Sequence, residues 1–226
     1  MLRDAPHMTK TLKIDFVSDV SCPWCAIGLH GLEQALERAS DVVTSDIVFQ
    51  PFELNPAMAP EGENFFEYIG KKYGTTREQS AANLTMLAER AAGVGFTMAR
   101  SERSRVYNTF DAHRLLHWAE GSGHQAELKH KLLEAYFTHG LDPSNQEVLV
   151  TAAANAGLDP DEAREVLTSG RYTEEVRAAE DLWRSRGISS VPAVIINGKY
   201  LISGGQPVEA FEKTIRQIAA EAETGS

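Results

Sequence analysis

The chain has only two cysteines, and they stand three positions apart in Cys22-Pro23-Trp24-Cys25. Without a third or fourth cysteine, one chain cannot build a zinc site of four cysteines or a separate structural disulfide. The spacing is compatible with a redox-active pair, with half of an intermolecular metal site, or with two inert thiols. The segments on either side of the pair therefore decide its interpretation.

The residues around the cysteines predict a strand before them and a helix after them. Residues 12–18 are rich in β-branched and apolar side chains, which is typical of a short strand. Pro23 suits the first position of a helix, where its missing N–H costs nothing, so Cys22 would be the N-cap residue. A second strand is predicted at 46–54, and strand, helix and strand together begin a βαβ unit.

A position at a helix N-terminus favours redox chemistry at Cys22. The thiolate is the nucleophilic form of cysteine, and the positive end of a helix dipole stabilises it. Cys25 would lie about one turn inside the helix and be less exposed. We therefore expect Cys22 to attack a substrate disulfide and Cys25 to resolve the mixed disulfide that forms.

The middle of the chain, residues 61–186, has the pattern of consecutive helices and contains no strong strand candidate. Thr75 with Glu78 resembles a capping box, and Asp159 followed by Pro160 is a typical helix start. The pattern predicts an α-helical insertion. Its last helix, at 173–186, can belong to the insertion or to the core.

Strand signals return after the insertion. Asn197-Gly198 lies between two apolar runs, which is a strong hairpin signal, and an amphipathic helix is predicted at 208–222. The first ten residues are predicted to be a tail outside the fold. The sequence thus predicts an α/β fold in three parts, with residues 11–60 and 187–223 forming one core and residues 61–186 inserted between them.

Four segments together resemble the thioredoxin superfamily and, within it, the DsbA branch: SDVSCPWC, FQPFELNP, NTFDAHRLLHWA and GISSVPAVIINGKYLISGGQP. They are similar to FrnE-like members of that branch, which are relatives of the 2-hydroxychromene-2-carboxylate isomerases and kappa glutathione transferases. The resemblance covers nearly all of residues 12–222. It implies a thioredoxin fold with a large all-helical insertion, and protein-disulfide oxidoreductase or isomerase activity.

The resemblance also implies roles for residues near the cysteines. In that superfamily the proline that matches Pro192 is cis and faces the Cys-x-x-Cys motif, and the backbone of the preceding residue, Val191, pairs with an extended substrate. Pro23 and Trp24 are then substrate contacts as well. The resemblance implies no metal and no tightly bound cofactor, and it makes glutathione a candidate redox partner.

Trp24 is a departure from periplasmic DsbA, which typically has Pro-His between its cysteines. Histidine can donate a hydrogen bond to a thiolate, whereas Trp24 offers only an indole N–H and a large apolar face. We therefore expect weaker thiolate stabilisation and a less oxidising couple than in periplasmic DsbA. Ala26 stands where FrnE-like proteins often have an aromatic residue.

Four further polar residues have predicted roles. Asp15 is the nearest candidate for a buried acid that takes a proton from the resolving cysteine, and a solvent-facing strand position is the alternative. Asp19 is predicted to turn the chain into the motif. His113 and His117 stand four apart on one predicted helix face, but no third ligand is identifiable, so packing or hydrogen bonding is expected instead of metal binding.

The formal charge of −10 argues against nucleic acid and anionic membranes as partners. No apolar run approaches the ~20 residues that cross a bilayer, and the N-terminus has no hydrophobic stretch of the kind that a secretory signal needs. We therefore expect a cytoplasmic protein that acts on thiol or disulfide proteins or small thiols. Either a monomer or a homodimer is compatible with the sequence.

Two rival functions are compatible with these features. One is a glutathione-dependent isomerase or transferase of the kappa or 2-hydroxychromene-2-carboxylate isomerase type, which would activate glutathione with a serine such as Ser21. The other is a non-catalytic binding module. Replacing Cys22 with serine separates the first rival from a disulfide oxidoreductase, because only the oxidoreductase depends on that thiol.

Overall fold

A four-stranded mixed sheet with the order β2-β1-β5-β6 forms the centre of the computed structural model, which describes residues 9–59, 61–99 and 104–224. Strand β1 is parallel to β2 and antiparallel to β5, and β5 is antiparallel to β6. Most of the predicted N-terminal tail lies outside the described residues. The strands are β1 (Lys10–Ser18), β2 (Val43–Pro51), β5 (Ala193–Ile196) and β6 (Tyr200–Ser203).

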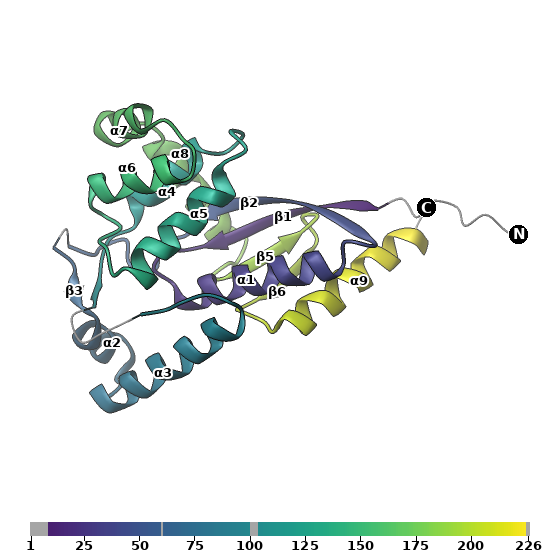
Figure 1. Cartoon of the computed structure of the whole chain (residues 1–226), viewed down its shortest axis with the longest axis horizontal. Helices are drawn as coiled ribbons and strands as arrows, with labels where there is room; N and C mark the ends of the chain where they lie inside the picture. Colours follow the sequence, from purple (N-terminus) through teal and green to yellow (C-terminus); the bar gives the residue numbers. More distant parts are fainter. Residues whose placement is uncertain (1–8, 60, 100–103, 225–226) are drawn as a thin grey trace, which may run out of the picture.

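Helices α1 (Pro23–Arg38) and α9 (Val208–Thr224) pack together over one face of this sheet (Figure 1). Strand side chains alternate between the two faces, so Phe16 packs into the core beneath α1, whereas Val17 packs on the opposite side. Phe16 meets Phe49 of the neighbouring strand edge to face, with ring centroids 5.8 Å apart. This core fixes α1 and therefore the position of its N-terminus.

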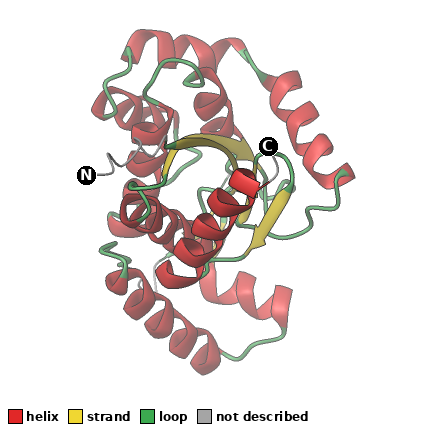
Figure 2. Cartoon of the chain, turned by 90° about the vertical axis from the view of Figure 1, so that its right-hand side faces the viewer, coloured by secondary structure: helices red, strands yellow, loops and turns green. Residues whose placement is uncertain are grey.

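The chain between β2 and β5 is largely helical, and Figure 2 shows helices surrounding the sheet. In the view of Figure 1, α4 to α8 lie above one end of the sheet, and α2 and α3 lie below it. Helices α4 to α7 share a core of leucine, valine and alanine side chains. The helices are α2 (Phe65–Tyr73), α3 (Arg77–Gly93), α4 (Phe110–Trp118), α5 (Gln125–Leu133), the π-helix η1 (Glu134–Thr138), α6 (Gln146–Asn155), α7 (Pro160–Ser169) and α8 (Thr173–Ser185).

Helix α8 covers the face of the sheet opposite α1. Its Trp183 is buried with Val17, Phe52 and Ile188, which form a small apolar cluster of their own. The sheet is therefore covered by helices on both faces, as an α/β fold requires.

Three details differ from the sequence-based prediction. The predicted all-helical region contains two strands, β3 (Glu63–Asn64) and β4 (Arg105–Val106), which are too short to show an alternating pattern. The capping box is formed by Thr76 and Gln79, one residue later than predicted. Helix α5 continues into a π-helix, so the helix predicted at 125–138 is two elements.

The second strand also begins and ends earlier than predicted. Its pairing with β1 stops at Pro51, and the chain then leaves the sheet. The backbone N–H groups of Glu53 and Leu54 donate to the buried carboxylates of Glu180 and Asp19 instead of to a strand. Side-chain acceptors from distant parts of the chain thus end the strand, and apolar pattern alone does not reveal them.

The predicted hairpin is confirmed. Asn197 and Gly198 both have positive φ, at 53° and 64°, and join β5 to β6. Lys199 completes the three-residue connection, and its N–H donates to the carbonyl of Ile196 at 3.1 Å. This bond closes a turn whose two central residues have positive φ, a geometry that matches the twist of the strands. Within the described part of the chain, no helix is long and apolar enough to cross a membrane.

Candidate active site

Cys22 is the N-cap residue of α1, and Pro23 occupies the first turn, as predicted. The backbone N–H of Cys22 donates to the carbonyl oxygen of Asp19 at 3.3 Å, and the N–H of Cys25 donates back to the carbonyl of Cys22 at 3.1 Å. Cys22 is 5% exposed and Cys25 is 0% exposed. The first turn of α1 carries no acidic residue, so nothing in it offsets the positive end of the helix dipole.

The segment around Pro192 lies against the first cysteine. The thiol of Cys22 donates to the carbonyl oxygen of Val191 at 3.7 Å, and the Val191–Pro192 peptide bond is cis. The carbonyl of Pro192 accepts from the N–H of Gly204 at 2.8 Å, which ties the segment to the end of β6. The structure therefore brings together the predicted residues from both halves of the core.

Two glycines allow this close approach. A Cβ atom at Gly28 would lie 3.1 Å from Cγ of Pro192 and 3.2 Å from Cα of Gly205. A Cβ atom at Gly205 would lie 2.9 Å from the carbonyl oxygen of Trp24. The sequence analysis did not single out these positions, although a glycine inside a predicted helix is a recognised sign of close backbone packing.

A groove of about 820 Å³ opens beside the cysteines. It runs from the head of α1 across the loop after β2 to α2 and α3, and most of its wall is apolar or aromatic. The guanidinium of Arg90 lies 5.4 Å from the centre of the Trp24 ring, on one side of the groove. We call it the thiol groove; its lining includes Cys22, Trp24, Leu54, Tyr68, Leu84 and Val191.

Asp19 is the buried acid of this site. Its side chain is fully buried and accepts hydrogen bonds from the N–H groups of Ser21, at 3.0 Å, and Leu54, at 2.7 Å. Nε2 of His113 lies 3.7 Å from it. Burial alone would raise the pKa of Asp19, but His113 and the two backbone N–H groups together hold that pKa below its ordinary value.

Asp15, the predicted candidate for a buried acid, lies elsewhere. It is half-buried on β1 and accepts a hydrogen bond from Nε2 of Gln50 at 2.8 Å. Asp19 was predicted only to turn the chain into the motif, which its bond to Ser21 does. Its burial depends on the loop after β2 and on helix α4, and these contacts leave no local sequence signal.

Cys25 has an electrostatic environment that opposes ionisation. Burial raises the pKa of the Cys25 thiol, and the neighbouring Cys22 raises it further. The positive charge of Lys129, a buried residue of α5, acts in the opposite direction. The sequence analysis missed Lys129, because a lysine on a helix is ordinarily solvent-facing.

The two histidines of α4 do not act together. His113 faces Asp19, whereas His117 is half-buried, lies 3.8 Å from Glu120 and packs its ring against Tyr172. Among the residues that the structure describes, no group of three or more histidine, cysteine, aspartate or glutamate side chains is placed to hold a metal ion.

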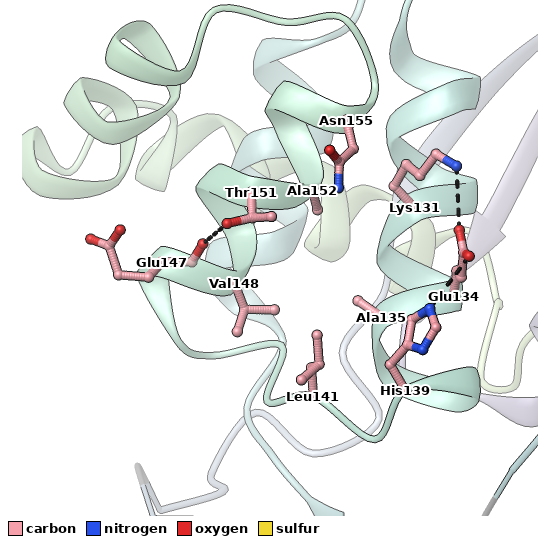
Figure 3. Close-up of a pocket in the computed structure, with 10 residues that line it drawn as sticks. All are labelled: Lys131, Glu134, Ala135, His139, Leu141, Glu147, Val148, Thr151, Ala152 and Asn155. Atoms are coloured by element: carbon pink, nitrogen blue, oxygen red, sulfur yellow. Dashed lines mark hydrogen bonds and ion pairs between the residues drawn. The ribbon is translucent and has the colours of Figure 1, made fainter.

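A second hollow, of about 510 Å³, lies between α5 with η1 and α6 (Figure 3). Figure 3 shows Lys131 and His139 at one wall of this hollow, each paired with a different carboxylate oxygen of Glu134. None of the predicted site residues lines it. The hollow is therefore separate from the thiol groove.

Comparison with known proteins identifies relatives that cover most of this chain. The chain is 25% identical over 206 residues to the uncharacterized protein YwbO of Bacillus subtilis (strain 168), covering 91% of this chain and 96% of that protein. The crystal structure of the probable DsbA oxidoreductase SCO1869 from Streptomyces coelicolor is 32% identical, covers 91% of this chain and 89% of its own, and superposes with a TM-score of 0.83.

A more distant structure has the same fold. The cytosolic disulfide reductase DsbM from Pseudomonas aeruginosa with GSH is 15% identical, covers 91% of this chain and 98% of its own, and superposes with a TM-score of 0.61. The family model for the DSBA-like thioredoxin domain matches residues 13–216, which is nearly the whole described fold. With its cysteine pair at the head of α1 and its helical insertion, this chain belongs to the DSBA-like thioredoxin domain family.

Proposed function

We propose that this chain is a thiol–disulfide oxidoreductase in which Cys22 is the nucleophile and Cys25 the resolving cysteine. The observation that carries the proposal is the arrangement of the pair: Cys22 caps α1 and borders the thiol groove, whereas Cys25 is fully buried behind it. A substrate in the groove meets the first sulfur and not the second. Cys22 is therefore proposed to react with the substrate, and Cys25 to react with the mixed disulfide that Cys22 forms.

In the first step the thiolate of Cys22 attacks one sulfur of a substrate disulfide. A mixed disulfide forms between Cys22 and that sulfur, and the other substrate sulfur leaves as a thiolate that takes a proton from water. The positive end of the α1 dipole favours the attacking thiolate. The carbonyl of Val191, 3.7 Å from the sulfur, accepts the thiol hydrogen in the resting dithiol.

In the second step Cys25 attacks the sulfur of Cys22 and completes the exchange. The Cys22–Cys25 disulfide forms and the second substrate sulfur is released as a thiol, so two electrons pass from the protein to the substrate. Another dithiol, or two molecules of glutathione, then returns the pair to the reduced form. The geometry of adjacent turns of one helix lets the two sulfurs join without unfolding α1.

The thiol groove supports an extended substrate with apolar side chains. Its volume of about 820 Å³ falls within the ~300–1,000 Å³ range of ligand pockets, and it continues past the cysteines along α2 and α3. Peptide segments around exposed disulfides fit such a groove, and so does a small thiol such as glutathione. Pro23, Trp24, Val191 and Pro192 are proposed as the contacts nearest the reacting sulfur.

Reduction of insulin by dithiothreitol tests the proposal. The wild-type protein should accelerate insulin precipitation, and both Cys22→Ser and Cys25→Ser variants should lose that acceleration. A binding module would not accelerate turnover, and a glutathione transferase or isomerase dependent on Ser21 would keep its activity in Cys22→Ser. We further propose that the protein is cytoplasmic and that its net reaction is the reduction of disulfides. Fractionation of cells tests the location, and the share of reduced Cys22 and Cys25 in that fraction tests the direction of the reaction.

A further inference from the structure

Lys129 of α5 is a buried cation without a hydrogen-bond partner. The residue is 0% exposed, and its Nζ atom makes no hydrogen bond within the part of the chain that the structure describes. The burial of an ammonium group carries a large desolvation penalty, and packing alone does not require a charged end. A leucine or methionine would fill the same space, so the charge itself needs an explanation.

Lys129 packs against the core that contains the cysteine pair. Gln125, one helical turn earlier on α5, holds the backbone of Phe49 on β2 through both its amide oxygen and its amide nitrogen. Lys129 follows on the same face of α5, and its Nζ lies 5.9 Å from the centre of the Phe49 ring. Phe49 packs against Phe16 beneath α1, in the apolar cluster that also contains both cysteines.

The titratable groups that act on Lys129 come from α1 and from the loop before it. Cys25 and Cys22 approach from α1, and Asp19 approaches from the loop before it. His113, from α4, lies against Asp19. Burial holds the pKa of Lys129 below its ordinary value, and the negative charges of Cys25, Asp19 and Cys22 limit that lowering. The ammonium group of Lys129 in return favours the ionised form of each of these three groups.

We propose that Lys129 is the positioning charge of the resolving step: its ammonium group offsets the negative charge that develops on Cys25 when Cys25 attacks the mixed disulfide. Cys25 gives up its proton, its sulfur bonds to that of Cys22, and the departing substrate sulfur takes a proton and leaves as a thiol. No other co-reactant is needed. This role for Lys129 rests on the proposed function, because it requires that Cys25 resolves a mixed disulfide at Cys22.

The apolar surroundings make this charge effective. Coulomb interactions in a water-excluded core are much stronger than in solvent, and Cys25 is itself fully buried. Cys22 borders the open groove, where water screens charge. Loss of the ammonium charge should therefore slow the attack by Cys25 far more than the attack by Cys22.

Ellman's reagent separates the two steps, because each releases one coloured thionitrobenzoate. Cys22 releases the first on forming the mixed disulfide, and Cys25 releases the second on resolving it. The test compares wild type, Lys129→Met and the matched control Lys131→Met by stopped flow at several pH values. Lys131 stands on the outward side of α5, with a side chain 33% exposed, and pairs with Glu134.

For Lys129→Met we expect the first release at the wild-type rate and the second slowed about ten-fold, because the pKa of Cys25 rises further once the cation that opposes the effect of burial is gone. Raising the pH should restore the second release, because more Cys25 is then ionised. Lys131→Met should match the wild type in both phases. Methionine removes an unpaired buried charge, so the midpoint of urea unfolding should be unchanged or higher.

Two results would overturn the inference: a second release equal to that of the wild type, or both releases slowed together without recovery at high pH. Failure of the proposed function has a different signature. In that case the wild-type protein itself releases no thionitrobenzoate that depends on Cys22.

Discussion

The thiol of Cys22 donates to the carbonyl oxygen of Val191, 3.7 Å away in space and 169 positions later in the chain. One partner heads α1, in the first part of the core, and the other precedes β5, in the last part. The whole helical insertion separates them in sequence. In the proposed reaction, disulfide exchange at Cys22 depends on how tightly the two parts of the core pack together, so substitutions at the contacts between them test the proposal.

Gly28 is the first such contact. In Gly28→Ala the new Cβ would sit 3.1 Å from Cγ of Pro192 and 3.2 Å from Cα of Gly205, so α1 and the segment that follows Val191 could no longer pack so closely. Overpacking costs about 1–3 kcal/mol, which outweighs the gain of about 1 kcal/mol in helix propensity. We expect lower stability in urea and slower insulin reduction.

Gly93→Ala is the matched control, because Gly93 ends α3 and a Cβ there would meet no heavy atom within 4 Å. It should keep full activity with equal or greater stability. Wild-type activity in Gly28→Ala would show that the close approach of Pro192 to α1 has no part in the reaction.

Asp19→Asn tests the buried acid. The folded-state pKa of Asp19 is held below its ordinary value of 3.8, so its contribution to stability is present at neutral pH and is lost as the pH falls through the folded-state pKa. Asparagine cannot replace a carboxylate that accepts from two backbone N–H groups and faces His113. We expect a loss of about 1–3 kcal/mol in urea unfolding near pH 7.

The loss should be smaller at pH 3 than at pH 7, because below the ordinary value of 3.8 the carboxylate is protonated in the unfolded protein, whereas the lowered pKa of Asp19 favours its ionised form in the folded protein. Asp15→Asn is the control on β1, where the side chain is only half-buried and bonds to Gln50. An Asp19→Asn variant with the same deficit at both pH values would contradict the electrostatic explanation.

Arg177 stabilises the loop that forms one wall of the thiol groove. It pairs with the buried carboxylates of Glu53 and, at 2.9 Å, Glu180, and Glu180 in turn accepts from the N–H of Glu53. In Arg177→Met two buried carboxylates face each other without this cation. Because the Arg177 side chain is 41% exposed, we expect a loss below the about 3–5 kcal/mol of a fully buried pair.

The sign of the pH dependence is opposite to that of Asp19. Burial raises the pKa of Glu53, and Glu180 adds to the rise while Arg177 opposes it, so stability is present at low pH and is lost as the pH rises through the folded-state pKa. The deficit of Arg177→Met in urea should therefore be larger near pH 8 than near pH 5. Arg171→Met, which breaks an exposed pair with Glu165, should show no such trend.

Trp24→Ala tests the groove as a binding surface. The Trp24 side chain is half-buried beside Cys22, with Arg90 over its ring. Loss of about 1.5 kcal/mol of apolar contact should raise KM for insulin about ten-fold. The rate with hydroxyethyl disulfide, which is too small to reach along the groove, should change much less. An equal loss on both substrates would indicate damage to the cysteine pair instead.

Local signals in the sequence predicted the parts of the site that local structure builds. Pro23 after Cys22 is a helix start whatever surrounds it, and Asn197-Gly198 is a hairpin turn by its own backbone preference. The place of Val191 and Pro192 beside the cysteines required the resemblance to a known family. No periodicity or capping rule relates residues so far apart in sequence.

The charged interior could not be predicted in this way. Asp19, Lys129 and Glu180 are all fully buried, and each is placed by elements from distant parts of the chain. Polar residues on predicted helices and loops are ordinarily exposed, so composition and pattern predict exposed positions for these three buried residues. The contacts of Glu180 and Asp19 with the N–H groups of Glu53 and Leu54 also end β2 at Pro51, three residues before the predicted end.

Mass spectrometry of a Cys25→Ala variant tests the division of labour between the two cysteines most directly. Treated with oxidised glutathione at neutral pH, the variant should hold one glutathione in a stable mixed disulfide at Cys22, which dithiothreitol removes. The Cys22→Ser variant should form no comparable adduct at the buried Cys25. An unmodified Cys22, or an adduct that forms equally well at Cys25 when Cys22 is serine, would contradict the account.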